Sequence, residues 1–258
     1  MQNELLFLGT CARDFSPRLE GDLRDCFDLD ARRSSSLLVG GSLLIDCGTH
    51  TLDSLRIAGI SRDAVTDLVV THLHSDHFDR ANIAKLAEGR ETPLRVWVRE
   101  GAAHGLPDTV EVRYMTPFSG YELASDVSVT GMPANHDAKA TPQHLLLELG
   151  GKKLLYACDG AWMLNETYYF LKNANLSVAV LDCTTGDYVG DFRMGEHNSI
   201  PMLRLMLPSM KTWGILSDES RVYFSHIAPS LHRPHAETEE IVRTFGASLA
   251  YDGLRVTL

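Results

Sequence analysis

The sequence predicts an α/β protein in which helices cover two β-sheets, and three observations lead to this prediction. Short apolar segments typical of buried strands alternate with segments that have helical periodicity. Glycine pairs at 40–41 and 150–151 separate neighbouring apolar segments, as expected for hairpins. The connections are short, and no composition shift or internal repeat marks a boundary. We therefore expect residues 1–258 to form a single domain.

The first half of the chain is expected to consist mainly of strands. In chain order these are 4–9, 34–39, 42–46, 68–70, 94–98, 110–115 and 121–132. The polar, irregular segment 10–33 interrupts them, and a loop of this length inside a domain is usually functional or mobile. Helices are expected near 51–58 and at 80–88, where Asp79 serves as N-cap and Gly89 ends the helix.

The second half repeats this alternation of strands and helices. The expected strands are 143–149, 152–158, 176–182 and 221–224, followed by a last pair of short strands near the C-terminus. The expected helices are 165–173, 199–208 and 236–245. A Gly- and Asp-rich loop over 183–197 ends in Glu196-His197-Asn198, directly before a helix.

Composition and charge limit the classes of function. The chain has 258 residues, of which 44% are hydrophobic and 22% are charged, an ordinary globular composition. Its formal charge of −10 argues against general binding of nucleic acids or anionic membranes. A small anionic substrate is compatible with this charge, because bound metal cations dominate the electrostatic field of a metal site.

Targeting signals and disulfides are not expected. The first ten residues lack a basic region and a long apolar run, so they do not resemble a signal peptide. No apolar run approaches the roughly 20 residues of a membrane span. The five cysteines are scattered and include no C-x-x-C pair, a pattern that suits a reducing compartment. We expect a cytoplasmic protein, and the sequence leaves a homodimer open.

A cluster of potential metal ligands follows the predicted strand 68–70. His72, His74, Asp76 and His77 fall within six positions, in the spacing H-x-H-x-D-H. Their nitrogen and oxygen donors suit zinc, and manganese or iron is also compatible with them. A polar surface loop with coincidental histidines is the competing interpretation, but it does not account for this spacing directly after a strand. We therefore expect a metal site here.

Three more potential ligands, His136, Asp159 and His226, each stand just beyond a predicted strand. Strand ends meet at one edge of a sheet, so residues distant in sequence can come together there. Taken singly, Asp159 could be a turn residue, His136 a solvated loop residue and His226 a cap of the next segment. Together with the first cluster they match the donors that a dinuclear centre needs, in which a carboxylate can bridge two ions.

Several motifs occur in one order along nearly the whole chain. They are LLIDCGTH (43–50), THLHSDH (71–77), LLYACDGA (154–161) and SHIAPS (225–230). With these motifs the chain resembles the metallo-β-lactamase superfamily. Within it the chain is most similar to the phosphoribosyl 1,2-cyclic phosphate phosphodiesterases of the carbon–phosphorus lyase pathway, and it is also similar to tRNase Z. Supporting segments are FLGT (7–10), RRSSSLLV (32–39), LDCTTGD (181–187), HNSI (197–200) and YDGLRV (251–256).

The resemblance implies a four-layer αβ/βα sandwich with two divalent metal ions at one edge of the sheets. It implies that the first ion is held by His72, His74 and His136, and the second by Asp76, His77 and His226. Asp159 would bridge the two ions, and Asp46 would support the ligands from behind, as carboxylates commonly do. His197 matches a histidine that acts on the leaving group in the phosphodiesterase family.

The resemblance also implies a mechanism. The two ions would share and activate a water that attacks phosphorus, with His197 as general acid for the leaving alkoxide. Asp76 would orient the nucleophile or accept its proton. The implied activity is that of a phosphodiesterase acting on a small cyclic phosphodiester such as a phosphoribosyl 1,2-cyclic phosphate. The alternatives are a thioester or lactam hydrolase on the same metal site, and a non-catalytic metal-binding regulatory protein.

Basic and hydroxyl side chains in the loops are candidates for holding a phosphate, namely Arg32, Arg33, Lys139, Arg193, Thr184 and Thr185. The chain departs from the phosphodiesterase family at 11–33, where only Cys11 and Cys26 remain of a cysteine-rich segment that binds a structural zinc. We therefore expect no such zinc, and we expect His232 and His235 to be surface residues. The basic arm of tRNase Z also has no counterpart. The expected partner is a small phosphorylated substrate, without nucleic acid or membrane.

Overall fold

Two seven-stranded sheets form the centre of the structure, a computed structural model that describes residues 4–123, 127–188 and 190–258. The first sheet has the order β14 (Arg255–Thr257), β1 (Glu4–Gly9), β2 (Ser36–Val39), β3 (Leu43–Ile45), β4 (Asp67–Val69), β5 (Arg95–Arg99) and β6 (Glu111–Met115). The second has the order β13 (Ala247–Leu249), β12 (Leu216–Ser225), β11 (Leu176–Asp182), β10 (Lys152–Ala157), β9 (Gln143–Leu149), β8 (Ser128–Pro133) and β7 (Gly120–Glu122).

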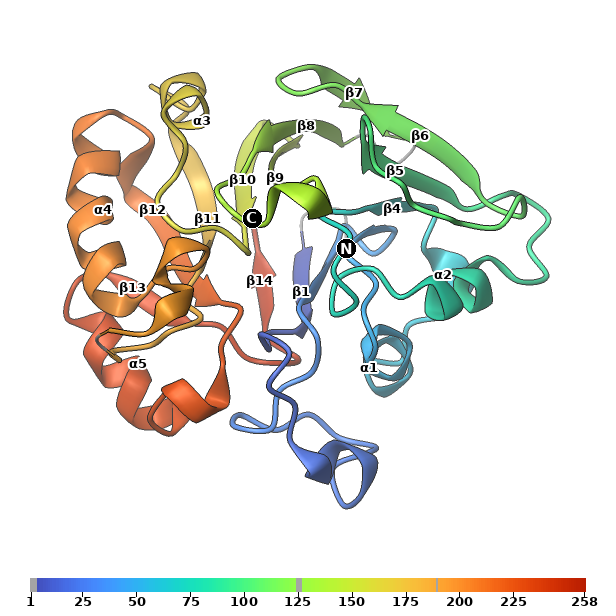
Figure 1. Cartoon of the computed structure of the whole chain (residues 1–258), viewed down its shortest axis with the longest axis horizontal. Helices are drawn as coiled ribbons and strands as arrows, with labels where there is room; N and C mark the ends of the chain where they lie inside the picture. Colours follow the sequence, from blue (N-terminus) through green and yellow to red (C-terminus); the bar gives the residue numbers. More distant parts are fainter. Residues whose placement is uncertain (1–3, 124–126, 189) are drawn as a thin grey trace.

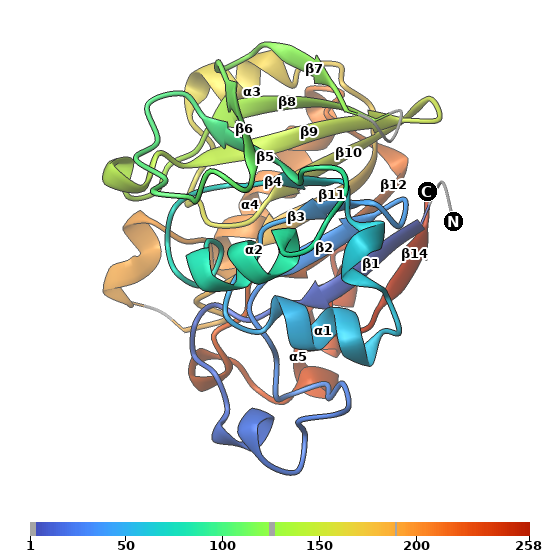
Figure 2. The same ribbon diagram turned by 90° about the vertical axis from the view of Figure 1, so that its right-hand side faces the viewer.

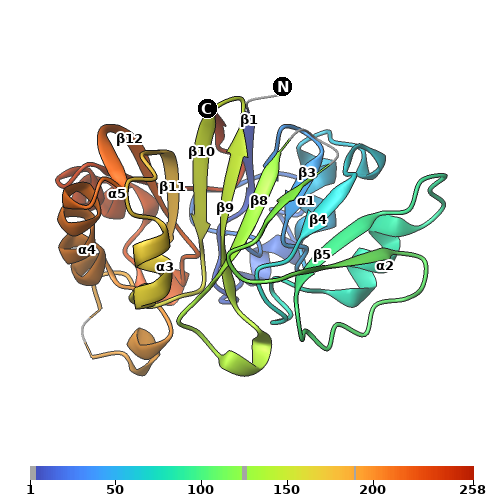
Figure 3. The same cartoon turned by 90° about the horizontal axis from the view of Figure 1, so that it is seen from above.

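Helices cover the outer face of each sheet. The first sheet carries α1 (Thr51–Ile57) and α2 (Arg80–Ala87), which lie in front of its strands in Figure 2. The second carries α3 (Asn165–Phe170), α4 (Ile200–Thr212) and α5 (His235–Arg243), on the opposite side of the molecule in Figures 1 and 3. The layers therefore run helix, sheet, sheet, helix, and the predicted four-layer αβ/βα sandwich is confirmed. None of the described helices is long and apolar enough to cross a membrane.

Three apolar cores hold these layers together. The central core lies between the sheets, where Phe7 of β1 and Ile45 of β3 share a cluster with Leu145 of β9 and Val180 of β11. Alternate residues of the same strands point outward into two further cores, one beneath α1 and α2 and the other beneath α4 and α5. Because successive side chains of a strand point to opposite faces, strands buried on both faces need the nearly continuous apolar runs seen in the sequence.

Some elements differ from the sequence-based expectations. Helix α4 continues through Pro208 to Thr212, because Met210, which follows the proline, is buried on the same helix as Leu203 and Leu207. The region expected as one strand, 121–132, contains two strands, β7 and β8, and residues 124–126 of that prediction lie outside the described residues. The two closing strands do not pair with each other, since β13 joins β12 and β14 joins β1.

Parallel pairing brings the polar ends of several strands to one edge. In the first sheet β3, β4 and β5 are parallel, and in the second β10, β11 and β12 are parallel. Asp46 and His226 directly follow β3 and β12, and Asp159 follows β10 after one intervening residue. All three have left-handed backbone conformations, with φ of 61°, 57° and 56° in that order. Such conformations are costly for residues other than glycine and are concentrated at functional sites.

Candidate metal centre

The first group of ligand candidates, here called the outer group, consists of His72, His74 and His136. His72 Nε2 lies 3.0 Å from His74 Nδ1, and His136 Nε2 lies 3.1 Å from the same atom. Three nitrogen ligands of a tetrahedral zinc ion, each about 2.0–2.1 Å from the metal, lie about 3.3 Å from one another. The spacing of these imidazoles therefore fits a shared metal ion.

The opposite ring nitrogens show which form of each imidazole is present. His72 Nδ1 donates to the Thr71 hydroxyl, 3.1 Å away, and His136 Nδ1 donates to the Glu196 carbonyl, 3.2 Å away. His74 Nε2 faces the Asp137 carboxylate at 3.4 Å. In the neutral imidazoles the converging nitrogens then carry lone pairs. Three lone pairs at this distance repel one another, and a cation between them removes the repulsion.

The second group, here called the inner group, consists of Asp76, His77 and His226. The Nε2 atoms of His77 and His226 lie 3.1 Å apart, and Asp76 Oδ2 lies 3.6 Å and 3.9 Å from them. His77 Nδ1 donates to Asp46 at 2.7 Å, and His226 Nδ1 donates to the Thr184 hydroxyl at 2.8 Å. The facing nitrogens therefore also carry lone pairs in the neutral rings, and a cation between them would be stabilised by this group as well.

Asp159 lies between the two groups and faces both. Its Oδ2 atom is 2.8 Å from His77 Nε2 and 2.9 Å from His226 Nε2. Its Oδ1 atom is 3.9 Å from His72 Nε2 and 3.7 Å from His136 Nε2. The buried Oδ2 atom has no hydrogen bond with acceptable angles despite these short distances. A carboxylate with one oxygen toward each group has the arrangement of a bridging ligand.

Asp46 and the turn that follows it hold the ligand loop in place. The Asp46 carboxylate accepts hydrogen bonds from the Thr71 backbone and hydroxyl, at 2.7 Å and 2.8 Å, in addition to the bond from His77. Cys47 N donates to the His77 carbonyl. A Cβ at Gly48 would lie 1.8 Å from the Asp76 carbonyl oxygen, so only glycine fits there. The sequence Asp-Cys-Gly after β3 thus positions the inner group.

His197 lies beside the inner group and is oriented by Asp182. His197 Nδ1 lies 2.9 Å from Asp182 Oδ2, and the rings of His197 and His226 stack with centroids 5.4 Å apart. Asp182 Oδ2 is also 3.3 Å from His226 Nδ1. The sequence analysis missed Asp182, although Asp182 is the last residue of β11 and so also lies at a strand end. With Nδ1 engaged, Nε2 is the nitrogen of His197 left for proton exchange.

The electrostatics of the cluster favour positive charge in the inner group. Burial alone would lower the pKa of His77, but the carboxylates of Asp159, Asp46 and Asp76 raise it well above its usual value. The pKa of His226 is raised well above its usual value in the same way, mainly by Asp159. In the outer group burial prevails, and it lowers the pKa of His72. A divalent cation in the inner group would balance the charge of these carboxylates.

The metal centre opens into a cavity of about 450 Å³. Of the residues proposed for phosphate binding, Arg193 and Thr184 line this cavity. The Thr184 hydroxyl is already engaged by Asp182 and His226. Thr185 is buried and donates to the Asn198 carbonyl, and Lys139 is exposed on the short 3₁₀ helix at Ala138–Ala140, away from the cavity lining.

Arg32 and Arg33 do not line the cavity, contrary to the sequence-based prediction. Both are buried, at 2% and 1% exposure. Arg32 donates to the Thr10 hydroxyl and the Ala250 carbonyl, and Arg33 donates to the carbonyls of Leu23 and Cys26. These hydrogen bonds hold the 10–33 segment in place, and this segment extends away from the sheets in Figures 1 and 2.

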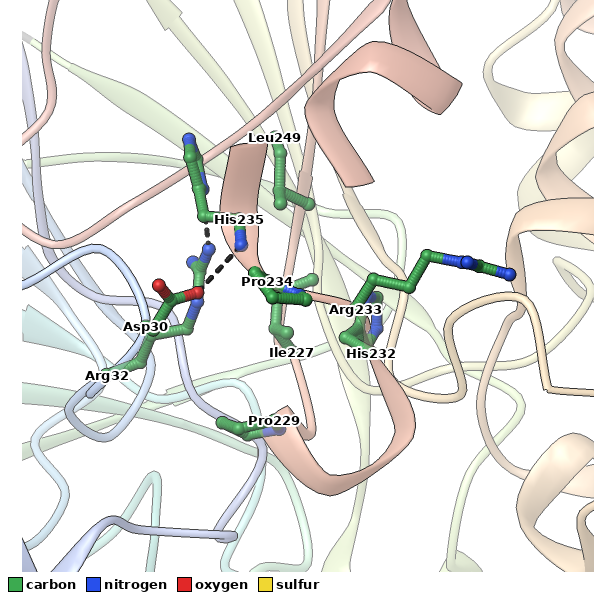
Figure 4. Close-up of a pocket in the computed structure, with 9 residues that line it drawn as sticks. All are labelled: Asp30, Arg32, Ile227, Pro229, His232, Arg233, Pro234, His235 and Leu249. Atoms are coloured by element: carbon green, nitrogen blue, oxygen red, sulfur yellow. Dashed lines mark hydrogen bonds between the residues drawn. The ribbon is translucent and has the colours of Figure 1, made fainter. Parts of the chain in front are cut away.

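His232 and His235 are not free surface side chains as expected. They line a separate pocket with Arg32, shown in Figure 4. His235 Nδ1 lies 2.9 Å from Arg32 Nη2, and the His235 backbone donates to Asp30. His232 Nε2 donates to the Cys183 carbonyl at 2.7 Å, and burial lowers the pKa of His232 to about 4. Both imidazoles therefore serve the packing of this region.

Comparison with known proteins gives partial sequence matches. The family model described as Anti-Pycsar protein Apyc1 matches residues 32–82, the segment with Asp46 and the H-x-H-x-D-H motif. A curated relative, Ribonuclease Z of Mycolicibacterium gilvum (strain PYR-GCK), is 32% identical over 120 residues. That match covers 40% of this chain and 39% of the relative, so the chain matches about two fifths of the relative's length.

Solved structures match over nearly the whole chain. A diphosphatase from the PhnP family has a TM-score of 0.74 with 20% identity, covering 99% of this chain and 96% of that one. The metallo-β-lactamase fold protein YhfI from Bacillus subtilis has a TM-score of 0.73 with 13% identity, covering 98% of each chain. At these identities the matches establish the architecture, and they agree with the two sheets and the helix layers described above. This chain has the metallo-β-lactamase fold.

Proposed function

We propose that the chain is a dinuclear metal-dependent hydrolase, and specifically a phosphodiesterase. The observation that carries this proposal is the convergence of imidazole lone pairs and carboxylate oxygens on two points, with Asp159 facing both. The outer group would hold one ion, the inner group the other, and Asp159 would bridge them. Both sheets contribute ligands, so we propose that residues 1–258 work as one hydrolase domain. Zinc or manganese suits the donors, and iron is compatible with them.

The side chains around the ions have separable tasks. When bound, the two ions would activate a water and neutralise charge on the phosphate oxygens. His197, held through Nδ1 by Asp182, donates a proton from Nε2 to the leaving oxygen. Asp76 lines the cavity beside the inner histidines and orients the attacking water or accepts its proton. The pKa of His197 is raised because Asp182 more than offsets burial, and this favours the protonated form that an acid needs.

The proposed substrate is a small cyclic phosphodiester, such as a phosphoribosyl 1,2-cyclic phosphate. The HNSI and SHI segments, which carry His197 and His226, support this choice through their resemblance to the phosphodiesterase family. Two of the similar proteins are named a diphosphatase and a ribonuclease, and both names denote cleavage at phosphorus. A cavity of about 450 Å³ is within the usual range for small-molecule sites.

An assay panel tests the bond that is cleaved. Metal-loaded protein would be given bis(p-nitrophenyl) phosphate, a cyclic phosphodiester, a glutathione thioester and a chromogenic cephalosporin. We expect turnover of the phosphodiesters. Thioester or lactam turnover without phosphodiester turnover would establish the alternative hydrolase classes, and no turnover of any substrate by fully loaded protein would favour a regulatory metal-binding protein.

Replacing His197 tests its role in catalysis. His197→Ala should lower phosphodiesterase kcat by about 10²–10⁴-fold, the usual worth of a general acid, and leave the metal content unchanged. Kinetics and elemental analysis of the same preparation measure both quantities. His104→Ala is a matched control, because His104 contacts Tyr114 away from the cavity. Loss of metal from His197→Ala would make His197 a ligand instead of an acid.

A further inference from the structure

Asn198 directly follows the proposed acid His197 and is buried, at 4% exposure. It does not line the cavity over the metal centre, so it does not touch a substrate bound there. Burying an amide costs free energy unless hydrogen bonds within the protein replace those to water. The partners of Asn198 therefore show what its burial achieves.

The backbone of Asn198 is tied to the loop that carries the acid. Its N–H donates to Asp182 Oδ1 at 2.8 Å, and the other oxygen of that carboxylate lies 2.9 Å from His197 Nδ1. Its carbonyl accepts from the backbone N–H and the hydroxyl of Thr185, at 3.2 Å and 3.1 Å. One carboxylate thus contacts two consecutive residues, so His197 and Asn198 are held as a unit.

The side chain of Asn198 reaches the turn that carries the bridging carboxylate. Its Nδ2 atom donates to the Gly160 carbonyl at 2.8 Å, and Gly160 directly follows Asp159. A Cβ at Gly160 would lie 2.6 Å from His144 Cε1, so this turn packs closely against a buried side chain. The Asn198 amide thus joins the loop of the acid to a turn that has little freedom to move.

The same amide is poorly suited to a purely stabilising role. Its Oδ1 atom is buried without a hydrogen-bond partner among the described residues. Leaving one buried polar atom without a partner costs free energy comparable to the gain from one hydrogen bond. What the amide provides is a fixed relation between two segments that are distant in sequence. Their residues His197 and Asp159 approach to 4.0 Å between Nδ1 and Oδ1.

From these contacts we propose that Asn198 is a positioning residue, which sets the place of the His197 acid relative to the bridging carboxylate of Asp159. It acts through His197 and does not itself touch the substrate. A displacement of about 1 Å can lower the rate of an enzymatic step by roughly 10²-fold, so a residue that fixes this geometry affects kcat. This inference rests on the proposed phosphodiesterase function of the same site.

Two esters with different leaving groups test the inference. p-Nitrophenolate departs readily without a proton, whereas the alkoxide released from a phosphoribosyl 1,2-cyclic phosphate needs one from the acid. Asn198→Ala should lower kcat on the cyclic ester by about 10–100-fold. On bis(p-nitrophenyl) phosphate the loss should be only a few fold, and the KM values and the metal content should stay unchanged. A merely structural role would lower both kcat values equally.

Asn135→Ala is the matched control for this comparison. Asn135 Nδ2 also donates to a backbone carbonyl close to Asp159 in the chain, that of Trp162, but this bond does not reach the loop of the acid. The ratio of the two kcat values should therefore stay unchanged in Asn135→Ala. Asn198→Ser, with a side chain one bond shorter, is the second variant if Asn198→Ala does not fold.

A double-mutant cycle tests whether Asn198 acts through His197. In a His197→Ala background, adding Asn198→Ala should change kcat on the cyclic ester little, because the acid that Asn198 positions is already absent. Independent, additive losses would overturn the inference.

Crystal structures of Asn198→Ala and of the unaltered protein in the same metal state give a readout that does not depend on turnover. The contact between His197 and Asp182 should remain, while the separation of His197 Nδ1 from Asp159 Oδ1 should change. An unchanged separation, equal losses on both esters, or loss of metal would overturn the positioning role while the phosphodiesterase function stands. Absence of turnover of both esters by the unaltered, metal-loaded protein would overturn the proposed function itself.

Discussion

The outer group has three histidines and the inner group has two histidines and an aspartate, and the groups differ in the exposure of His74 and in the residues behind the ligands. His72 and His136, at 1% and 2% exposure, are as buried as the inner histidines. His74 of the outer group has a side chain that is 33% exposed, whereas those of His77 and His226 are 0% and 2% exposed. Asp46 supports His77 with a carboxylate 2.7 Å away. In the outer group the supporting atoms are a hydroxyl, a backbone carbonyl and the Asp137 carboxylate at 3.4 Å.

This difference teaches that the two proposed ion sites should not be equivalent. A close carboxylate behind a histidine fixes the ring and increases its basicity, and a buried site loses its ion less readily to water or chelators. We therefore expect the inner site to retain its ion and the outer site to exchange it. Both groups face the cavity, the outer group through His74 and His136 and the inner group through Asp76 and His226, but only His74 has a substantially exposed side chain. Tight binding of the inner ion would hold the ligand cluster in place, and weaker binding of the outer ion would leave that ion accessible to the substrate.

The largest effect is expected from the residue that the two groups share. Asp159→Ala should reduce the content of both ions and lower phosphodiesterase activity by roughly 10³-fold or more, because water activation by the ions is lost. Elemental analysis after gel filtration, together with kcat, measures this effect. A variant that keeps two ions per chain would refute the bridging role of Asp159. A variant that loses only one would show that the carboxylate belongs to a single group.

A smaller effect is expected from replacing the carboxylates that contact the ligand histidines. This effect should be larger in the inner group than in the outer group. Asp46→Asn should weaken the tighter of the two ion sites by about 10–100-fold, the usual consequence of losing such support. Asp137→Asn is the matched substitution in the outer group, and its effect should be only a few fold because its contact is longer and partly exposed. Competition with a chromophoric chelator measures both affinities. Equal losses in the two variants would contradict the proposed difference between the groups.

The ligand candidates at 72–77 could be predicted from sequence, because they lie close together in a single loop. The spacing of His72 to His77 after a strand places four donors on one loop. The strand-end rule then pointed to His136, Asp159 and His226, and the structure brings all of them within the same cluster. The rule applied equally to Asp182, the last residue of β11, which the sequence analysis did not select.

The positions of Arg32 and Arg33 could not be predicted, because their burial depends on how the irregular segment 10–33 folds and on residues near the C-terminus. Arg32 contacts Ala250, and the backbone N–H of Arg33 donates to Asp252. Burying a guanidinium is acceptable only when several acceptors satisfy it. The acceptors of Arg32 include the Thr10 hydroxyl and the Ala250 carbonyl, and those of Arg33 are carbonyls within the segment 10–33. A sequence pattern shows that a basic residue lies in a loop, but it does not show whether the loop turns that residue inward.

The smallest of these effects concerns the proton donor beside the inner group. His197 must be protonated to act as an acid, so its contribution is present below its pKa and is lost as pH rises through that value. Asp182 raises this pKa above the usual 6.5 despite burial. In Asp182→Asn the pKa of His197 should fall, and the alkaline decline of kcat should begin at lower pH.

We expect kcat to fall more at about pH 8.5 than at about pH 6, because a lower pKa of His197 reduces its protonated fraction most at alkaline pH. The pH dependence of kcat over this range measures the effect. Metal content must be measured in the same samples, because Asp182 also lies 3.3 Å from His226 Nδ1.

Asp187→Asn is the control, because Asp187 lies in the same loop and pairs with Arg233 at the surface. An unchanged pH profile with full metal content would show that Asp182 does not set the pKa of His197. A uniform loss at all pH values with loss of metal would assign Asp182 to the support of His226, as Asp46 supports His77.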